Sequence, residues 1–191
     1  MKKIGILASY NGTGFLALYE ACKNLELNAT IQLVISNNSD ANVLKSASIR
    51  DIENHCINSK LYPNDDIDLK ISNIFIEKKC DYIFLSGYMK KINQPLLKLY
   101  NNRIINSHPS LLPKFGGVGM YGRFVHQAVF EAKEQKTGVT IHFINENYDE
   151  GEYILQKEID IRGLKTVEQI ESSVKQIETS AILEAFKNIL N

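Results

Sequence analysis

An amide and an imidazole stand two residues apart in the chain. Asn106 and His108 stand at the carboxyl end of a predicted buried strand, residues 103–107, and Pro109 comes directly after His108. Residues two apart on a strand share a face, so both groups would project from the same strand end. The amide can donate to a developing oxyanion, and the imidazole can donate or shuttle a proton near neutral pH. This pairing suits acyl transfer.

Two observations bear on that interpretation. No G-x-S-x-G nucleophile motif is present, which favours direct attack on an acyl group over a covalent acyl-enzyme. Against it, a lone His beside a Pro is more often a residue that stabilises a loop. Spacing alone leaves both readings open.

The elements that must position these groups alternate between strands and helices. Strands are expected at residues 3–8, 29–36, 82–85, 103–107, 137–145 and 152–161. Helices are expected at residues 15–23, 41–50, 68–79, 93–100, 124–133 and 166–190, with loops at 55–66 and 110–122. The order predicts one α/β domain over residues 1–191, a mostly parallel twisted sheet flanked by helices on both faces. Ligands bind such sheets beyond the carboxyl ends of the strands.

Composition excludes several classes of protein. The 191 residues allow one good core, and 22 Lys and Arg balance 22 Asp and Glu, so nucleic acid is not expected as a partner. No apolar run is long enough for a membrane helix, and the polar residues 9–11 interrupt the first one, so a cytoplasmic protein is expected. Cys22, Cys56 and Cys80 form no C-x-x-C pair, which predicts reduced, buried thiols and no metal site.

Residues 106–114, NSHPSLLPK, resemble the N-x-H-P-S/A-L-L-P signature of the folate-dependent formyltransferases. The likeness extends from residue 4 to the final helix and implies a Rossmann-like fold. It also implies a catalytic trio of Asn106, His108 and Asp149, with 10-formyltetrahydrofolate as co-substrate, a ribonucleotide amine as acceptor, and no metal. Asn106 and a protonated His108 would stabilise the tetrahedral oxyanion, while Asp149 would favour the charged imidazole and position a water that carries a proton.

The same resemblance implies where the two ligands bind. Backbone N–H groups of Gly12, Thr13 and Gly14 would hold the ribonucleotide phosphate, although Tyr10 and Gly14 depart from the usual S-G-N-G-S-N turn. Further substrate contacts would come from Gly87, Pro109 and Glu178. Folate contacts would come from Met89, Lys90, Lys91, Ile92, Asn106, Asn145, Glu146, Asn147 and Tyr148.

Other features have competing interpretations. His126 and His142 are expected to be structural, and the glycine-rich residues 115–123 suit either a mobile flap or a tight loop. The rival functions are an N-formyltransferase acting on an amino-sugar nucleotide and a non-catalytic folate- or nucleotide-binding homologue. The three matching catalytic residue types argue against the second rival. A monomer or a homodimer is expected.

Overall fold

The computed structural model describes residues 1–190. Within it the chain forms two compact units, Met1–Ile105 with Leu190 and Asn106–Ile189, which are described in turn. The boundary falls inside the strand β5 (Ile104–His108), whose last three residues belong to the second unit.

The first unit alternates strands and helices. Its strands are β1 (Lys2–Ala8), β2 (Ala29–Ser36), β3 (Asn54–Cys56) and β4 (Tyr82–Leu85). Its helices are α1 (Thr13–Lys23), α2 (Asn42–Ser48), α3 (Ile67–Glu77) and α4 (Gln94–Leu99). β1 pairs in parallel with both β2 and β4, and its apolar side chains are fully buried because helices cover both faces.

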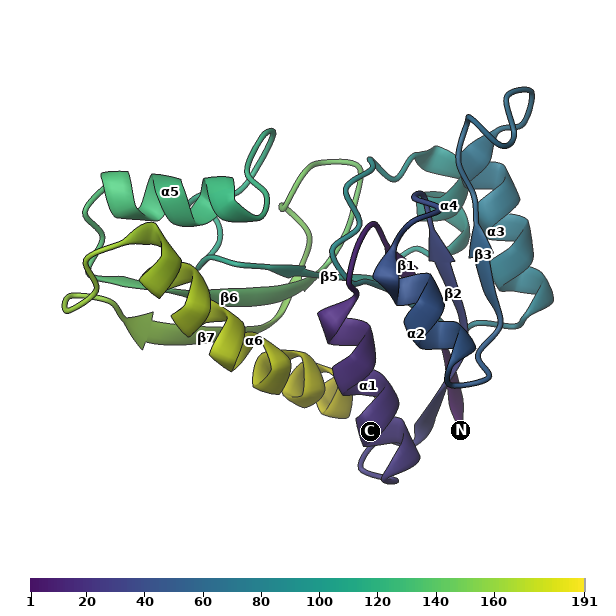
Figure 1. Ribbon diagram of the computed structural model, residues 1–191, viewed down its shortest axis with the longest axis horizontal. Helices are drawn as coiled ribbons and strands as arrows, with labels where there is room; N and C mark the ends of the chain where they lie inside the picture. Colours follow the sequence, from purple (N-terminus) through teal and green to yellow (C-terminus); the bar gives the residue numbers. More distant parts are fainter. Residues whose placement is uncertain (191) are drawn as a thin grey trace. The chain divides into compact units, whose positions relative to one another are not determined.

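The direction of the crossovers decides which face each helix covers. The chain moves outward from β1 to β2 to β3 and then returns to β4 on the other side of β1. Right-handed crossovers therefore place α1 and α2 on one face and α3 and α4 on the other, as Figure 1 shows. The strand order reverses between β1 and β4, and open α/β sheets bind ligands at that point.

The second unit is built on a hairpin. It contains α5 (Arg123–Glu131), β6 (Lys136–Phe143), β7 (Tyr153–Asp160) and α6 (Val167–Leu190). β6 and β7 pair in an antiparallel ladder that shifts register between Ile141 and His142. β6 is buried along nearly its whole length, whereas β7 alternates half-buried and exposed residues. At this shift β7 has one extra residue, and such a β-bulge changes the direction of the neighbouring side chains.

All seven strands belong to one sheet, in the order β3-β2-β1-β4-β5-β6-β7. The predicted α/β class, with a mostly parallel sheet and flanking helices, is confirmed. β6 and β7, which pair in antiparallel fashion, lie at the end of this order.

Two sequence expectations were wrong in part. The segment predicted as a loop from residue 55 begins with β3, a three-residue strand that pairs with β2 and is too short for alternation to reveal. The thiols are free, as expected, but only Cys80 is buried, while Cys22 and Cys56 are half-buried. None of the helices in residues 1–190 is long and apolar enough to cross a membrane.

Candidate active site

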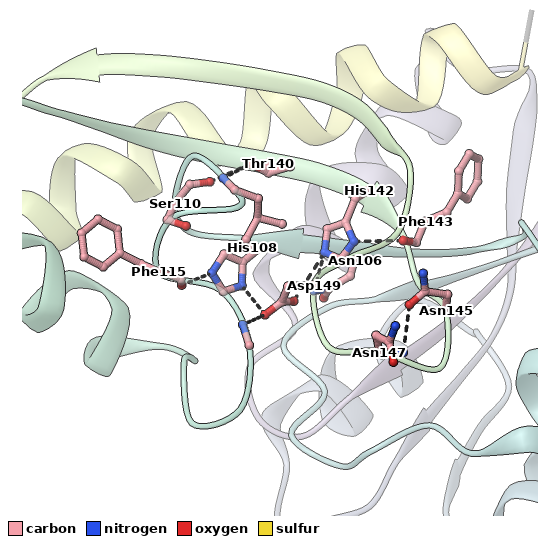
Figure 2. Close-up of polar contacts among 12 residues, drawn as sticks. Asn106, His108, Ser110, Phe115, Thr140, His142, Phe143, Asn145, Asn147 and Asp149 are labelled. Carbon is pink, nitrogen blue, oxygen red and sulfur yellow. Dashed lines mark hydrogen bonds and ion pairs between the residues drawn. The ribbon is translucent and has the colours of Figure 1, made fainter.

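β5 delivers two polar side chains to one cluster and a third to the opposite side. Asn106 Nδ2 lies 3.2 Å from His142 Nε2, and the His108 ring faces Asp149 (Figure 2). Ser107, between them in the chain, donates instead to Glu178 on α6, at 2.6 Å. The alternation of a strand therefore separates Asn106 and His108 from their neighbour, as the sequence predicts.

His142 orients the amide of Asn106. Its Nδ1 lies 2.9 Å from the carbonyl oxygen of Phe143, which can only accept, so Nδ1 carries the hydrogen. Nε2 is then the acceptor, and the nitrogen of the Asn106 amide, rather than its oxygen, must face it. Burial lowers the pKa of His142, which favours this neutral form. The amide nitrogen has a second hydrogen for another acceptor.

His108 is held between two acceptors. Its Nε2 donates to the carbonyl oxygen of Phe115 at 2.8 Å, and its Nδ1 lies 3.5 Å from Asp149 Oδ2. The residue is 3% exposed. For His108 to donate to a ligand, as the resemblance implies, that ligand must take the place of the Phe115 carbonyl.

Asp149 reaches the cluster from the loop after β6. Its Oδ2 accepts from the N–H of Gly117 at 2.9 Å, and its Oδ1 lies 3.7 Å from His142 Nε2. The loop closes tightly behind it, since a Cβ on Gly151 would lie 1.7 Å from the oxygen of Phe143. Asp149 itself has a φ of 58°, in the left-handed region. One carboxylate thus faces two imidazoles.

Thr140 fixes the loop that follows β5. Its Oγ1 donates to the carbonyl of Ser110 at 2.7 Å and accepts from the N–H of Leu112 at 3.0 Å and from Gln156 at 2.9 Å. Thr140 and His142 share one face of β6, so a single strand positions both the loop and Asn106. Sequence reasoning expected His142 to be mainly structural. The signal for a site role was its pairing with Thr140.

The first turn of the other unit presents backbone groups. Gly12 caps α1 with a φ of 63°, and a Cβ there would lie 2.4 Å from Val43 Cγ2, so the turn requires glycine. The first N–H groups of a helix have no partner within it. The N–H of Phe15 donates to Ser86 Oγ. Thr13 and Gly14, which precede Phe15 in the first turn of α1, carry the two N–H groups before it.

The segment after β4 is anchored at its start. The N–H of Met89 donates to Ser9 Oγ at 2.8 Å. Met89, Lys90 and Lys91 are exposed, whereas Ile92 is 6% exposed and lies in the core. Of the four predicted folate residues here, three therefore present exposed side chains and one, Ile92, does not.

The loop before Asp149 is exposed, and hydrogen bonds between its own residues stabilise it. Asn145 Oδ1 accepts from the N–H of Asn147 (Figure 2), and Asn147 Nδ2 donates to Glu150. Glu146 and Tyr148 are also exposed. Within residues 1–190 no group of His, Cys, Asp and Glu is placed to hold a metal ion.

Glu178 is the remaining predicted substrate residue. It is half-buried on α6, and burial raises the pKa of its carboxyl group, although the bond from Ser107 opposes the shift. Gly87 is exposed with a φ of 71°, and Pro109 is half-buried.

The model of the formyl transferase family matches residues 2–186, and the chain therefore belongs to this family. Its relatives include phosphoribosylglycinamide formyltransferase of Bacillus subtilis, which is 32% identical over the whole chain and 95% of its own length. The chloroplastic enzyme of that name from Arabidopsis thaliana is 31% identical over 96% of this chain, which spans 63% of that protein. The crystal structure of glycinamide ribonucleotide transformylase 1 from Geobacillus kaustophilus superposes with a TM-score of 0.91, at 30% identity and with full coverage of both chains.

Proposed function

We propose that this protein transfers the formyl group of 10-formyltetrahydrofolate to the primary amine of glycinamide ribonucleotide, a step of purine biosynthesis. The observation that carries the proposal is the cluster in which one carboxylate, Asp149, faces His108 and His142 while His142 orients Asn106. The names of the relatives supply the acceptor and the formyl group, and the resemblance of residues 106–114 to the folate-dependent formyltransferases supplies the donor.

The chemistry requires a hydrogen-bond donor for a developing negative charge. The amine nitrogen attacks the formyl carbon, and the electron pair of the C=O bond moves to oxygen. The free N–H of Asn106 donates to that oxyanion; such a donor is worth roughly 10²–10³ in rate. Collapse of the intermediate breaks the bond to N10 of the folate, which takes up a proton while the amine loses one.

His108 and Asp149 stabilise the negative charge on the formyl oxygen and assist the transfer of the proton from the amine to the folate. Ligand binding displaces the Phe115 carbonyl from His108 Nε2, so that this nitrogen donates to the formyl oxygen. Asp149, 3.5 Å from Nδ1, balances a charged ring and positions the water that carries the proton from amine to folate.

The phosphate of the ribonucleotide binds at Gly12, Thr13 and Gly14. The start of α1 offers N–H groups and the positive end of the helix dipole, and neither depends on a particular side chain. The Tyr10 and Gly14 departures therefore leave the backbone contacts intact. Gly87, Pro109 and Glu178 complete the substrate contacts.

Folate binds to the segment after β4 and to the loop before Asp149. Met89, Lys90 and Lys91 contact the pteridine ring through backbone groups and exposed side chains, with Ile92 beneath them. The contacts from the second loop come from Asn145, Glu146, Asn147 and Tyr148. A cytoplasmic location and a monomeric or homodimeric state stay predictions.

A turnover assay tests the proposal directly. Purified protein is incubated with 10-formyltetrahydrofolate and either glycinamide ribonucleotide or an amino-sugar nucleotide, and tetrahydrofolate release is followed by absorbance. Turnover with the first amine supports the proposal. Turnover with the second alone would identify a sugar-nucleotide enzyme, and binding without turnover would identify a non-catalytic homologue.

A further inference from the structure

Two buried serines connect the segments that follow β1 and β4. Ser9 directly follows β1, and its Oγ accepts from the N–H of Met89 in the segment after β4, at 2.8 Å. Ser86 directly follows β4, and its Oγ accepts from the N–H of Phe15 in the first turn of α1, at 3.0 Å. Each strand end thus holds the segment that follows the other strand.

The two serines are firmly held. Ser9 is 2% exposed and Ser86 is 7% exposed. The Ser9 hydroxyl also donates to Asn37 Oδ1 at 2.6 Å, so its hydrogen and one of its two lone pairs are engaged. Their backbones are paired as well, with Ser9 N–H donating to Gly87 and Ser86 N–H to Leu7. The bond from Phe15 is buried and the bond from Met89 is partly buried. An N–H that loses its acceptor away from water is costly, so movement of one segment disturbs the other.

We propose that Ser9 and Ser86 are positioning residues that couple the binding of the phosphorylated amine to the binding of the folate. The inference rests on the proposed function, which assigns the first turn of α1 to phosphate and residues 89–92 to folate. Ordering one segment by its ligand orders the other through these two bonds. The second ligand then meets a segment that is already in place, which is positive cooperativity.

The test measures a coupling factor. Isothermal titration calorimetry gives the dissociation constant of glycinamide ribonucleotide with and without saturating folic acid, which has no formyl group to transfer. We expect saturating folic acid to lower the dissociation constant of glycinamide ribonucleotide for the wild-type protein about fivefold or more, which is within the usual range of coupling between two sites. Ser9→Ala and Ser86→Ala should each lose at least half of this effect, and the double variant should show a factor near one.

Ser36→Ala is the matched control. Ser36 also ends a strand, is fully buried and accepts from a backbone N–H, that of Asn38 at 3.1 Å, but it joins no segment after β1 to one after β4. It should keep the wild-type factor. Cooperative thermal melting establishes that each variant is folded, and the single variants carry the test if the double variant does not fold.

Steady-state kinetics distinguish a positioning role of the two serines from a general loss of protein stability. With both substrates saturating, kcat of the single variants should stay close to wild type while KM rises for both substrates. A fall in kcat without a change in KM would overturn the proposal, as would a wild-type coupling factor of one or a wild-type factor in the double variant. A wild type that turns over without coupling overturns this inference alone, whereas one that binds neither ligand overturns the proposed function as well.

Discussion

The two units of the chain hold different kinds of polar groups. At the ends of β1 and β4 in the first unit, the groups are backbone N–H groups and small hydroxyls, as at Gly12, Ser9 and Ser86. At the end of β5 in the second unit, they are an amide, two imidazoles and a carboxylate in mutual contact.

The difference teaches where side-chain identity matters. A backbone N–H is supplied by any residue that can adopt the turn, so we expect the departures at Tyr10 and Gly14 from the S-G-N-G-S-N turn to have little effect on binding. In the second unit each group acts through its own atoms and holds its neighbour, so a change at one residue disturbs the others. Substitutions should therefore have larger effects in the second unit than in the first, unless they introduce charge.

The largest effect is expected from His108→Ala. In the proposed mechanism the variant loses the ring that lies between Asp149 and the formyl oxygen, so kcat should fall by about 10² or more. The dissociation constant for glycinamide ribonucleotide, measured by calorimetry, should stay nearly unchanged. Retained turnover would remove His108 from the mechanism.

Thr13→Asp tests the first unit. A carboxylate at the proposed phosphate site should raise KM for the ribonucleotide roughly tenfold or more, because the two like charges repel and about 1.4 kcal/mol is a tenfold change in affinity. Thr13→Ala is the control and should bind almost normally, since Thr13 is exposed and contributes its N–H. Steady-state kinetics with each substrate varied provide the measurement, and an equal rise in KM for folate would misplace the phosphate site.

His142→Leu tests whether this residue holds Asn106. Loss of the acceptor at 3.2 Å lets the amide turn, and we expect kcat to fall about tenfold, equivalent to about 1.4 kcal/mol. An unaffected kcat would return His142 to a purely structural role.

The same variant should change the pH dependence of stability. Because burial lowers the pKa of His142, the unfolded chain binds more protons than the folded one below pH about 6.5, and the free energy of unfolding falls as the pH drops through that range. Denaturant melts should show a shallower loss in His142→Leu. Some loss should persist, since burial also lowers the pKa of His126.

The smallest effect is expected from Glu178→Gln. Burial raises the pKa of this carboxyl group, so the folded state binds its proton more tightly, and stability is lost as the pH rises above the ordinary range of a Glu. The amide oxygen can still accept from Ser107. The variant should match wild type at pH 4 and be slightly more stable at pH 7 by thermal melting; a less stable variant at pH 7 would contradict this assignment.

Most of the fold could be predicted because local patterns persist in it. The apolar runs of β1, β2 and β4 and the spacing of α1 and α3 appear where the sequence places them, with ends displaced by a few residues at most. β3 was missed because three residues are too few for a period and its pairing with β2 is not local.

The sequence by itself determined that Asn106 and His108 share a strand face, since strand alternation is a property of the backbone. It also placed glycine where the turn before α1 needs a positive φ. Only the tertiary structure decided that His142 orients Asn106 and that Phe115 occupies His108 Nε2, because both depend on contacts between segments distant in the chain. It likewise decided the exchange of hydrogen bonds by Ser9 and Ser86. That exchange arises because β1 and β4 lie side by side in the sheet, although their first paired residues, Ile4 and Tyr82, are 78 positions apart in the chain.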